Sequence, residues 1–206
     1  MTEFGLLKLK GIIGFSDVTK TIQNTELMAR IMNYASDIDV LIMQHAEDFE
    51  LSKNSCINEG EVATRLGLQG VSDIAEKIII ERDLALLSEF TCRYHINQIS
   101  SEKSLNVIKK NRKNGKKFTA GVSINNLSLN ENDIGEFKTF LKLSPPLRLE
   151  KDRLSLIQGI KENFIDVIVS DHRPEDEESK RLPFAQAATG SIGIETLLPL
   201  ALEMYH

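Results

Sequence analysis

Polar side chains able to do acid–base or metal chemistry follow four short apolar runs of this sequence. Asp17 comes directly after GIIGFS, and His45 comes after VLIMQ, with Glu47 close behind it. Gln98 lies near the end of RYHINQI, and Asp171 follows IDVIVS. Imidazole and carboxylate groups gathered in one place can bind zinc, which generates hydroxide near neutral pH, and a neighbouring carboxylate can act as general base. These residue types are therefore the ones that a metal-assisted hydrolase needs.

The same residues also have a plainer interpretation, which the sequence alone leaves open. A histidine at the end of a strand is commonly a hydrogen-bonded structural residue, so His45, His95 and His172 could anchor loops or the core. Side chains alternate along a strand, so His95 need not share a site with Gln98, three residues further on. A metal site and a set of structural anchors are both compatible with the pattern.

The elements that must position these residues alternate between β-rich runs and amphipathic helical patterns. This alternation predicts an α/β fold with parallel strands and crossover helices. The predicted strands are Gly11–Ser16, Val40–Gln44, Arg93–Ile99, Phe118–Ile124 and Ile165–Ser170. The predicted helices are Asn24–Ser36, Ser72–Phe90, Ser101–Lys113, Glu150–Glu162 and Gly193–Met204. Periodicity alone does not separate an open doubly wound sheet from part of a (β/α)8 barrel, but in both folds the sites lie at the carboxyl ends of the strands.

Length and composition exclude several classes of protein. The chain has 206 residues, of which 41% are hydrophobic and 27% charged, as in ordinary globular proteins. No apolar run reaches the ~18 residues that cross a membrane, and the first residues lack the apolar core of a secretory signal. Cys56 and Cys92 form no disulfide framework and are expected to be inert thiols. We therefore predict one cytoplasmic domain over residues 1–206, with no separate second domain.

Charge and glycine patterns argue against nucleic-acid and nucleotide partners. The formal net charge is −5, so no global field attracts nucleic acid. The basic run Lys109–Lys117 has no interleaved aromatic residue, and we expect it to be a solvated helix end that stops at Gly115. No glycine-rich phosphate loop follows a predicted strand, which disfavours a flavodoxin-like binding module.

Six sequence motifs, in order along the chain, resemble those of a known family. They are QHAED (Gln44–Asp48), EGEVATRLGLQGVSDIAE (Glu59–Glu76), RYHINQIS (Arg93–Ser100), SPPLR (Ser144–Arg148), VIVSDHRPE (Val167–Glu175) and TGSIGIETLLPLAL (Thr189–Leu202). In these motifs the chain resembles the dihydroorotases of the amidohydrolase superfamily. The resemblance implies a partial (β/α)8 barrel, namely strands four to eight of the family's barrel. It also implies a zinc cofactor and the reversible cyclisation of carbamoyl aspartate to dihydroorotate in pyrimidine biosynthesis.

Residue by residue, the resemblance carries over only part of the family's site. It implies that His45 and Asp171 are metal ligands and that Asp171 is also the catalytic general base. It implies substrate contacts at Arg148, Ser144, Glu175 and Gly190. Among these, Ser144 stands where the family has asparagine and Glu175 where it has histidine.

Two further positions depart from the family at expected metal ligands. Val18 stands where many members have the acid that bridges the metals, and Asp17 is one position early, which in a strand would reverse the side chain. Gln98 stands where a histidine ligand is expected, and a neutral amide is a poor ligand for metals of the zinc class. Asn125 and Asn126 occupy a strand end where many relatives carry histidines.

These departures lead to two hypotheses about function. The chain is either a zinc dihydroorotase whose catalysis, and with it the zinc, is impaired or lost through these replacements, or a noncatalytic dihydroorotase-like subunit that supports aspartate carbamoyltransferase. It contains no H-x-H motif, which the family has on its first barrel strand, and it is expected to begin near the helix before strand four. A sheet of five barrel strands would leave two unpaired edges and an uncovered inner face, so we also expect a homo- or hetero-oligomer.

Overall fold

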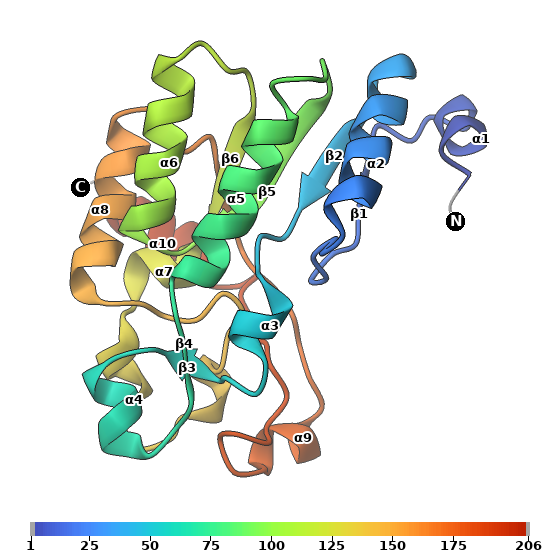
Figure 1. Cartoon of the computed structure of the whole chain (residues 1–206). Coiled ribbons are helices and arrows are strands. Elements are labelled where there is room, and N and C mark those ends of the chain that lie inside the picture. The colour runs from blue at the N-terminus through green and yellow to red at the C-terminus, as the bar shows by residue number, and fades with distance from the viewer. Residues whose placement is uncertain (1–2, 205–206) are drawn as a thin grey trace.

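The computed structural model describes residues 3–204 and has as its main body one sheet of parallel strands backed by helices (Figure 1). Five strands lie in the order β1-β2-β5-β6-β7, and each neighbouring pair is parallel. Their bounds are β1 (Gly14–Ser16), β2 (Leu41–Gln44), β5 (Arg93–Ile99), β6 (Thr119–Ser123) and β7 (Val167–Val169). The predicted α/β class with five parallel strands is confirmed, and each strand falls within its predicted range.

Helices connect the strands and gather on one side of the sheet, where α2, α5, α6 and α8 stand in a row (Figure 1). The helices are α1 (Phe4–Leu9), α2 (Thr25–Asp37), α3 (Phe49–Ser52), α4 (Glu61–Leu66), α5 (Ile74–Leu86), α6 (Glu102–Lys113), α7 (Ile124–Ser128), α8 (Glu150–Lys161), α9 (Glu177–Arg181) and α10 (Leu197–Glu203). Two short 3-10 helices cover Glu131–Ile134 and Thr139–Leu141. Within residues 3–204, no helix is long and apolar enough to span a bilayer.

Local sequence signals explain where the longer helices begin and end. The side chains of Asn24 and Ser101 accept hydrogen bonds from the first turns of α2 and α6, and so satisfy amides that have no partner inside the helix. Helix α6 stops at Lys113, and Gly115 follows with a φ of +85°. The basic run is therefore a helix end, as expected, and its Arg112 pairs with Asp166 rather than with a ligand.

The two faces of the sheet have different surroundings. Ile42, Tyr94 and Ile96 are buried on the face that carries the helices. Met43 and His95 are paired across β2 and β5 and point to the opposite face, where both are only partly buried. Parallel sheets usually have both faces covered, because their strands are joined by helices on the faces. Here the outer edges of β1 and β7 have no strand partner among residues 3–204, and the sheet is open, as expected.

A β-bulge in β5 shapes the carboxyl end of the sheet. The pairing of β5 with β6 shifts register between Ile96 and Ile99. A Cβ atom on Gly121 would lie 2.4 Å from the carbonyl oxygen of Asn97, so the two strands approach closely enough here to require glycine. A bulge re-aims side chains, and Gln98 lies within this one.

A second, smaller core lies beyond the carboxyl ends of the strands, in the lower part of Figure 1. It forms around the two-stranded parallel sheet of β3 (Ile57–Asn58) and β4 (Gly70–Val71), in the stretch between the predicted strand Val40–Gln44 and the predicted helix Ser72–Phe90. Its buried apolar residues are Ile57, Val62, Ala63, Ile134, Leu143, Leu147 and Phe184. This core forms one side of the pocket at the end of the sheet.

Candidate functional site

Three polar side chains meet where β2 ends. His45 follows β2, and its Nε2 lies 3.1 Å from Oε2 of Glu47. The Ser144 hydroxyl comes from a distant loop, donates to the same Glu47 oxygen at 3.2 Å and lies 3.3 Å from His45 Nε2. Burial opposes ionisation of Glu47, but the hydrogen bonds and charge of its neighbours, His45 first, outweigh burial, so its pKa lies below the ordinary value. The arrangement is thus a carboxylate held by imidazole and hydroxyl.

The expected general base pairs with an amide. Gln98 Nε2 donates a hydrogen bond to Oδ1 of Asp171 at 3.0 Å. Burial raises the pKa of Asp171 above its ordinary value, although the Gln98 hydrogen bond and the nearby His45 partly oppose this shift. The other amide atom, Gln98 Oε1, is buried and has no hydrogen-bond partner in the described part of the chain. The structure thus brings His45, Gln98 and Asp171 to one end of the sheet, as the sequence predicts.

The end of β1 contributes no ligand to this cluster. Val18 is 71% exposed, and its φ of +58° places it in the left-handed region, which a β-branched residue rarely occupies. Asp17 is exposed and lines a different hollow, between β1 and α2. The prediction that Asp17 could replace the missing ligand therefore has no geometric support.

The conformation of Val18 leads to a stability prediction. Val18→Asn should raise the free energy of unfolding by about 1 kcal/mol, because asparagine tolerates the left-handed region better than a β-branched residue. The matched control is Val167→Asn, in the extended backbone of β7, which should lower stability because asparagine is disfavoured in strands. Urea unfolding of both variants measures the difference. Equal effects of the two changes would show that the Val18 backbone stores no strain.

The donor set does not fit the zinc that the resemblance implies. Catalytic zinc sites use three protein ligands drawn from His, Cys, Asp and Glu. In the part of the chain that the structure describes, no three such side chains gather closely enough to hold a metal ion. His45 and Asp171 supply two suitable groups, and the third position holds the Gln98 amide, whose NH2 rather than its oxygen faces the carboxylate. The described residues therefore do not complete a zinc site by themselves.

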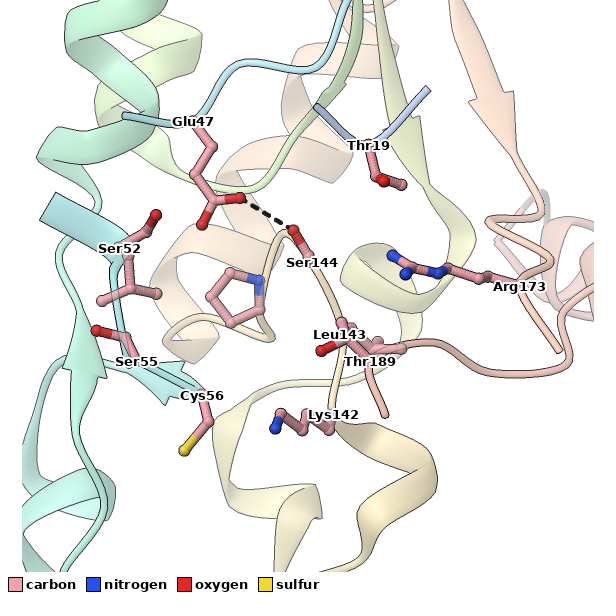
Figure 2. A pocket seen from close by; sticks show the side chains of 12 residues that line it. Thr19, Glu47, Ser52, Ser55, Cys56, Lys142, Leu143, Ser144, Arg173 and Thr189 are labelled. Carbon is pink, nitrogen blue, oxygen red and sulfur yellow. Dashed lines mark hydrogen bonds between the residues drawn. The ribbon is translucent and has the colours of Figure 1, made fainter. Parts of the chain in front are cut away.

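A pocket of about 260 Å³ opens beside the cluster (Figure 2). Its lining residues are Thr19, Glu47, Ser52, Ser55, Cys56, Val71, Lys142, Leu143, Ser144, Pro146, Arg173 and Thr189. Figure 2 shows the Glu47 carboxylate and the Ser144 hydroxyl facing each other across their hydrogen bond, with the Arg173 side chain reaching in from the opposite wall. Hydroxyl groups and cations on these walls suit a small polar ligand with acidic groups.

Arg148 lies in the scaffold rather than on the pocket wall. Its guanidinium is buried and donates to the Ser100 hydroxyl at 3.0 Å, to Asn58 Oδ1 at 2.9 Å and to the carbonyl of Val71 at 2.8 Å. Ser100 in turn binds the buried carboxylate of Glu76. Arg148 thereby ties the end of β5 to the two-stranded sheet. That it contacts substrate stays a prediction, but its donors already have protein acceptors.

The remaining predicted substrate contacts lie in the loop after β7. Glu175 accepts a hydrogen bond from Nε of Arg173 at 3.2 Å, so it holds a residue of the pocket wall. Gly190 has a φ of +141°, and a Cβ on it would lie 2.5 Å from the Arg173 carbonyl oxygen. Lys180 Nζ donates to the carbonyls of Ala188 and Gly190 at 2.8 and 2.7 Å. These residues shape the loop, and their contact with a substrate stays a prediction.

Sequence reasoning missed the buried lysine that fixes this loop from the other side. Lys142 lines the pocket, and its Nζ donates to the carbonyls of Ala185 and Ala187, both at 2.8 Å. Burial lowers the pKa of Lys142. Nothing in its local sequence separates it from a surface lysine, because its acceptors lie more than forty residues further along the chain.

The two thiols and His95 of β5 lie outside the strand-end cluster. Burial raises the pKa of Cys56, and it raises that of Cys92 to about 11, so both thiols stay protonated at neutral pH. His95 Nδ1 lies 2.8 Å from the Thr119 hydroxyl and not in the cluster with Gln98. Of the asparagines after β6, Asn126 donates to the carbonyl of Pro146 at 3.0 Å and so supports the loop that carries Ser144.

Comparisons with known proteins identify the family of this chain. The family model described as dihydro-orotase-like matches residues 1–104. The dihydroorotase of Ehrlichia chaffeensis is 44% identical over 207 residues, which cover 100% of this chain and 46% of that protein. A dihydroorotase of Wolbachia from Drosophila simulans is 40% identical over 100% of this chain and 47% of its own length. The chain thus spans about half the length of the curated relatives that it matches.

Solved structures share the fold at lower identity. A D-hydantoinase (dihydropyrimidinase) from Thermus matches with a TM-score of 0.77 at 18% identity, over 98% of this chain and 47% of that one. The dihydroorotase of Saccharomyces cerevisiae, solved with 5-fluoroorotic acid, matches with a TM-score of 0.68 at 14% identity, over 88% of this chain and 48% of that one. Both likenesses concern the fold, and both again leave about half of the neighbour unmatched.

Proposed function

This chain belongs to the dihydroorotase-like family, and from that premise we propose that it is a noncatalytic dihydroorotase-type protein of pyrimidine biosynthesis. The full family reaction would close carbamoyl aspartate to dihydroorotate, or open the ring by adding water to its cyclic amide. Water addition needs an activated nucleophile and a base free to move a proton. Among the described residues no three ligands gather to hold a metal that would activate the water, and the one candidate base, Asp171, is hydrogen-bonded to Gln98.

The observation that carries the proposal is the Gln98–Asp171 hydrogen bond. An ionised Asp171 could take a proton from water, but its Oδ1 already accepts from the Gln98 amide. Gln98 cannot relay that proton, because a side-chain amide does not titrate near neutral pH. The second carboxylate, Glu47, has a lowered pKa and is held by His45 and Ser144, which makes it a weak base. Two acids are therefore present, and both are tied to structural partners.

The pocket nevertheless keeps groups that can bind a ligand without converting it. Thr19, Ser144 and Thr189 present hydroxyls, and Arg173 presents a guanidinium from the facing wall. Such groups match the carboxylates and amides of carbamoyl aspartate and dihydroorotate. We propose that either compound binds there without turnover, in a protein of the cytoplasm.

The role that remains for a noncatalytic member is association, and we propose aspartate carbamoyltransferase as the partner. That enzyme makes carbamoyl aspartate, the compound that a dihydroorotase consumes. The open sheet edges provide the exposed surface that a stable complex requires.

Co-purification tests the proposed role. The chain should co-elute with aspartate carbamoyltransferase of the same organism at micromolar concentration, and the complex should convert no dihydroorotate. Free transferase mixed with an unrelated protein of equal size is the control. Separate elution of the two proteins, or ring opening that Asp171→Asn abolishes, would refute the noncatalytic role.

A further inference from the structure

Arg173 enters the pocket wall from the loop that follows β7, and the protein fixes both its backbone and its stem (Figure 2). Its backbone N–H donates to the carbonyl of Ser191 at 2.9 Å. The stem lies against Gly190, where an added Cβ would come within 2.8 Å of Arg173 Cγ. Glu175 accepts a hydrogen bond from Nε at 3.2 Å. The direction of the guanidinium toward the pocket is therefore set by its neighbours.

The two terminal nitrogens of the Arg173 guanidinium have no hydrogen-bond acceptor in the described part of the chain, where the side chain donates through Nε alone. The two carboxylates at the strand ends have other donors, since Glu47 accepts from Ser144 and Asp171 accepts from Gln98. The Arg173 side chain is 42% exposed, so a ligand in the pocket can reach its N–H groups. Such a guanidinium fork pairs with a carboxylate through two parallel hydrogen bonds.

The two lysines near Arg173 are already bonded to backbone carbonyls. Lys180 Nζ donates to three carbonyls at 2.7 to 2.8 Å, which uses every donor of an ammonium group. Lys142 Nζ donates to two carbonyls, both at 2.8 Å. The lysines add positive charge to this wall of the pocket without a matching fork of donors. Of the three cations, Arg173 is therefore the one that offers the paired N–H groups a carboxylate prefers.

The facing wall of the pocket has the opposite charge. Glu47 lies there beside Ser144, and its carboxylate repels a ligand carboxylate but can accept from the N–H groups of a ligand (Figure 2). The pocket thus has an acceptor side at Glu47 and a donor side at Arg173. Dihydroorotate and carbamoyl aspartate both carry amide N–H groups and at least one carboxylate, so the two walls favour one orientation of either ligand.

We propose that Arg173 is the specificity-determining residue that selects a ligand bearing a carboxylate, and that Glu175 is a positioning residue that acts by holding Arg173 Nε. The inference rests on the proposed binding of dihydroorotate or carbamoyl aspartate in this pocket, and it names the group that recognises the acid. The terminal nitrogens of Arg173 take the ligand carboxylate, while the amide N–H groups of the ligand face Glu47. Dihydrouracil, the same ring without the carboxylate, lacks the group that Arg173 recognises.

Calorimetric titration of the full chain with dihydroorotate and with dihydrouracil tests this assignment. The unaltered chain should bind dihydroorotate more tightly than dihydrouracil. Arg173→Gln should weaken dihydroorotate about 10- to 100-fold, the range for hydrogen bonds to a charged group, and should leave the affinity for dihydrouracil unchanged. Arg181→Gln makes the same change at an exposed arginine of α9, paired with Glu177, and should alter neither affinity.

Two kinds of failure can be told apart in this titration. Equal weakening of both ligands by Arg173→Gln, or dihydroorotate binding that survives the change, overturns the assignment of Arg173 and leaves the proposed ligand class in place. An unaltered chain that binds neither compound overturns the proposed ligand class and the assignment together.

Substitutions at Glu175 test its positioning role. Glu175→Leu removes the acceptor of Arg173 Nε and should weaken dihydroorotate severalfold, whereas Glu175→Gln keeps an acceptor oxygen and should retain most of the affinity. Adding Glu175→Leu to Arg173→Gln should cause no further loss, because Glu175 acts through Arg173. Circular dichroism checks that each variant folds. A further loss in the double variant would mean that Glu175 contacts the ligand itself, which overturns its positioning role.

Discussion

Replacing Arg148 by methionine is expected to lower the free energy of unfolding by about 3–5 kcal/mol, because the change leaves a buried partner charge without its counterion. Arg148 is 4% exposed and Glu76 is 2% exposed, and Ser100 bridges them. Without the guanidinium, the Asn58 side-chain oxygen also loses its donor. Methionine fills similar space, so the loss reports the polar network rather than a cavity.

Two controls separate this network from charge in general. Arg30→Met removes an exposed cation paired with Glu26 and should cost at most about 1 kcal/mol. Combining Arg148→Met with Glu76→Gln should recover part of the loss, because the buried carboxylate is then neutral. Urea denaturation of the variants provides the free energies. If Arg148→Met left stability unchanged and instead abolished ligand binding, the residue would be a substrate contact after all.

Gln98→His is expected to tighten zinc binding about 100-fold. The new imidazole would join His45 and Asp171, and two histidines with one carboxylate form a known catalytic zinc set. Four-ligand zinc sites bind with about 10–16 kcal/mol, or about 3 kcal/mol for each ligand, which corresponds to a factor of about 100. The Asp171 carboxylate would lose its amide partner at the same time.

The matched control for this change is Gln98→Asn, which removes the same contact without adding a zinc ligand. Its zinc affinity should equal that of the unaltered chain in a competition titration with a chromogenic chelator. Adding His45→Ala to Gln98→His should reverse the gain. Equal affinities of Gln98→His and Gln98→Asn would mean that the three positions do not converge on one metal.

The strands of the sheet are predictable because each has a recognisable pattern in its own residues. Each strand combines β-branched or aromatic residues, and polar caps such as Asn24 and Ser101 mark the helices between them. The sequence does not predict the two-residue strands β3 and β4, since so short a pairing leaves no periodic pattern. Helix α1 likewise lacks a buried stripe that a periodicity search could find.

The candidate site is predictable only in part, for a similar reason. His45, Gln98 and Asp171 converge because each stands at or near the carboxyl end of a parallel strand, and these ends meet at one edge of the sheet. The strand ends can be located in the sequence. Gln98 lies in a bulge that arises from the pairing of β5 with β6. The residues of β5 alone do not predict this bulge. The burial of Arg148 depends on the two-stranded sheet, and its sequence motif alone suggested a substrate contact.

The zinc content of the unaltered chain shows whether its own residues form a hydrolytic metal site. The chain would be equilibrated with excess zinc, dialysed against metal-free buffer and analysed by mass spectrometry. We expect substoichiometric zinc that dialysis removes, with no difference between the unaltered chain, His45→Ala and Asp171→Asn. One zinc per chain that survives dialysis and is lost in both variants would contradict it.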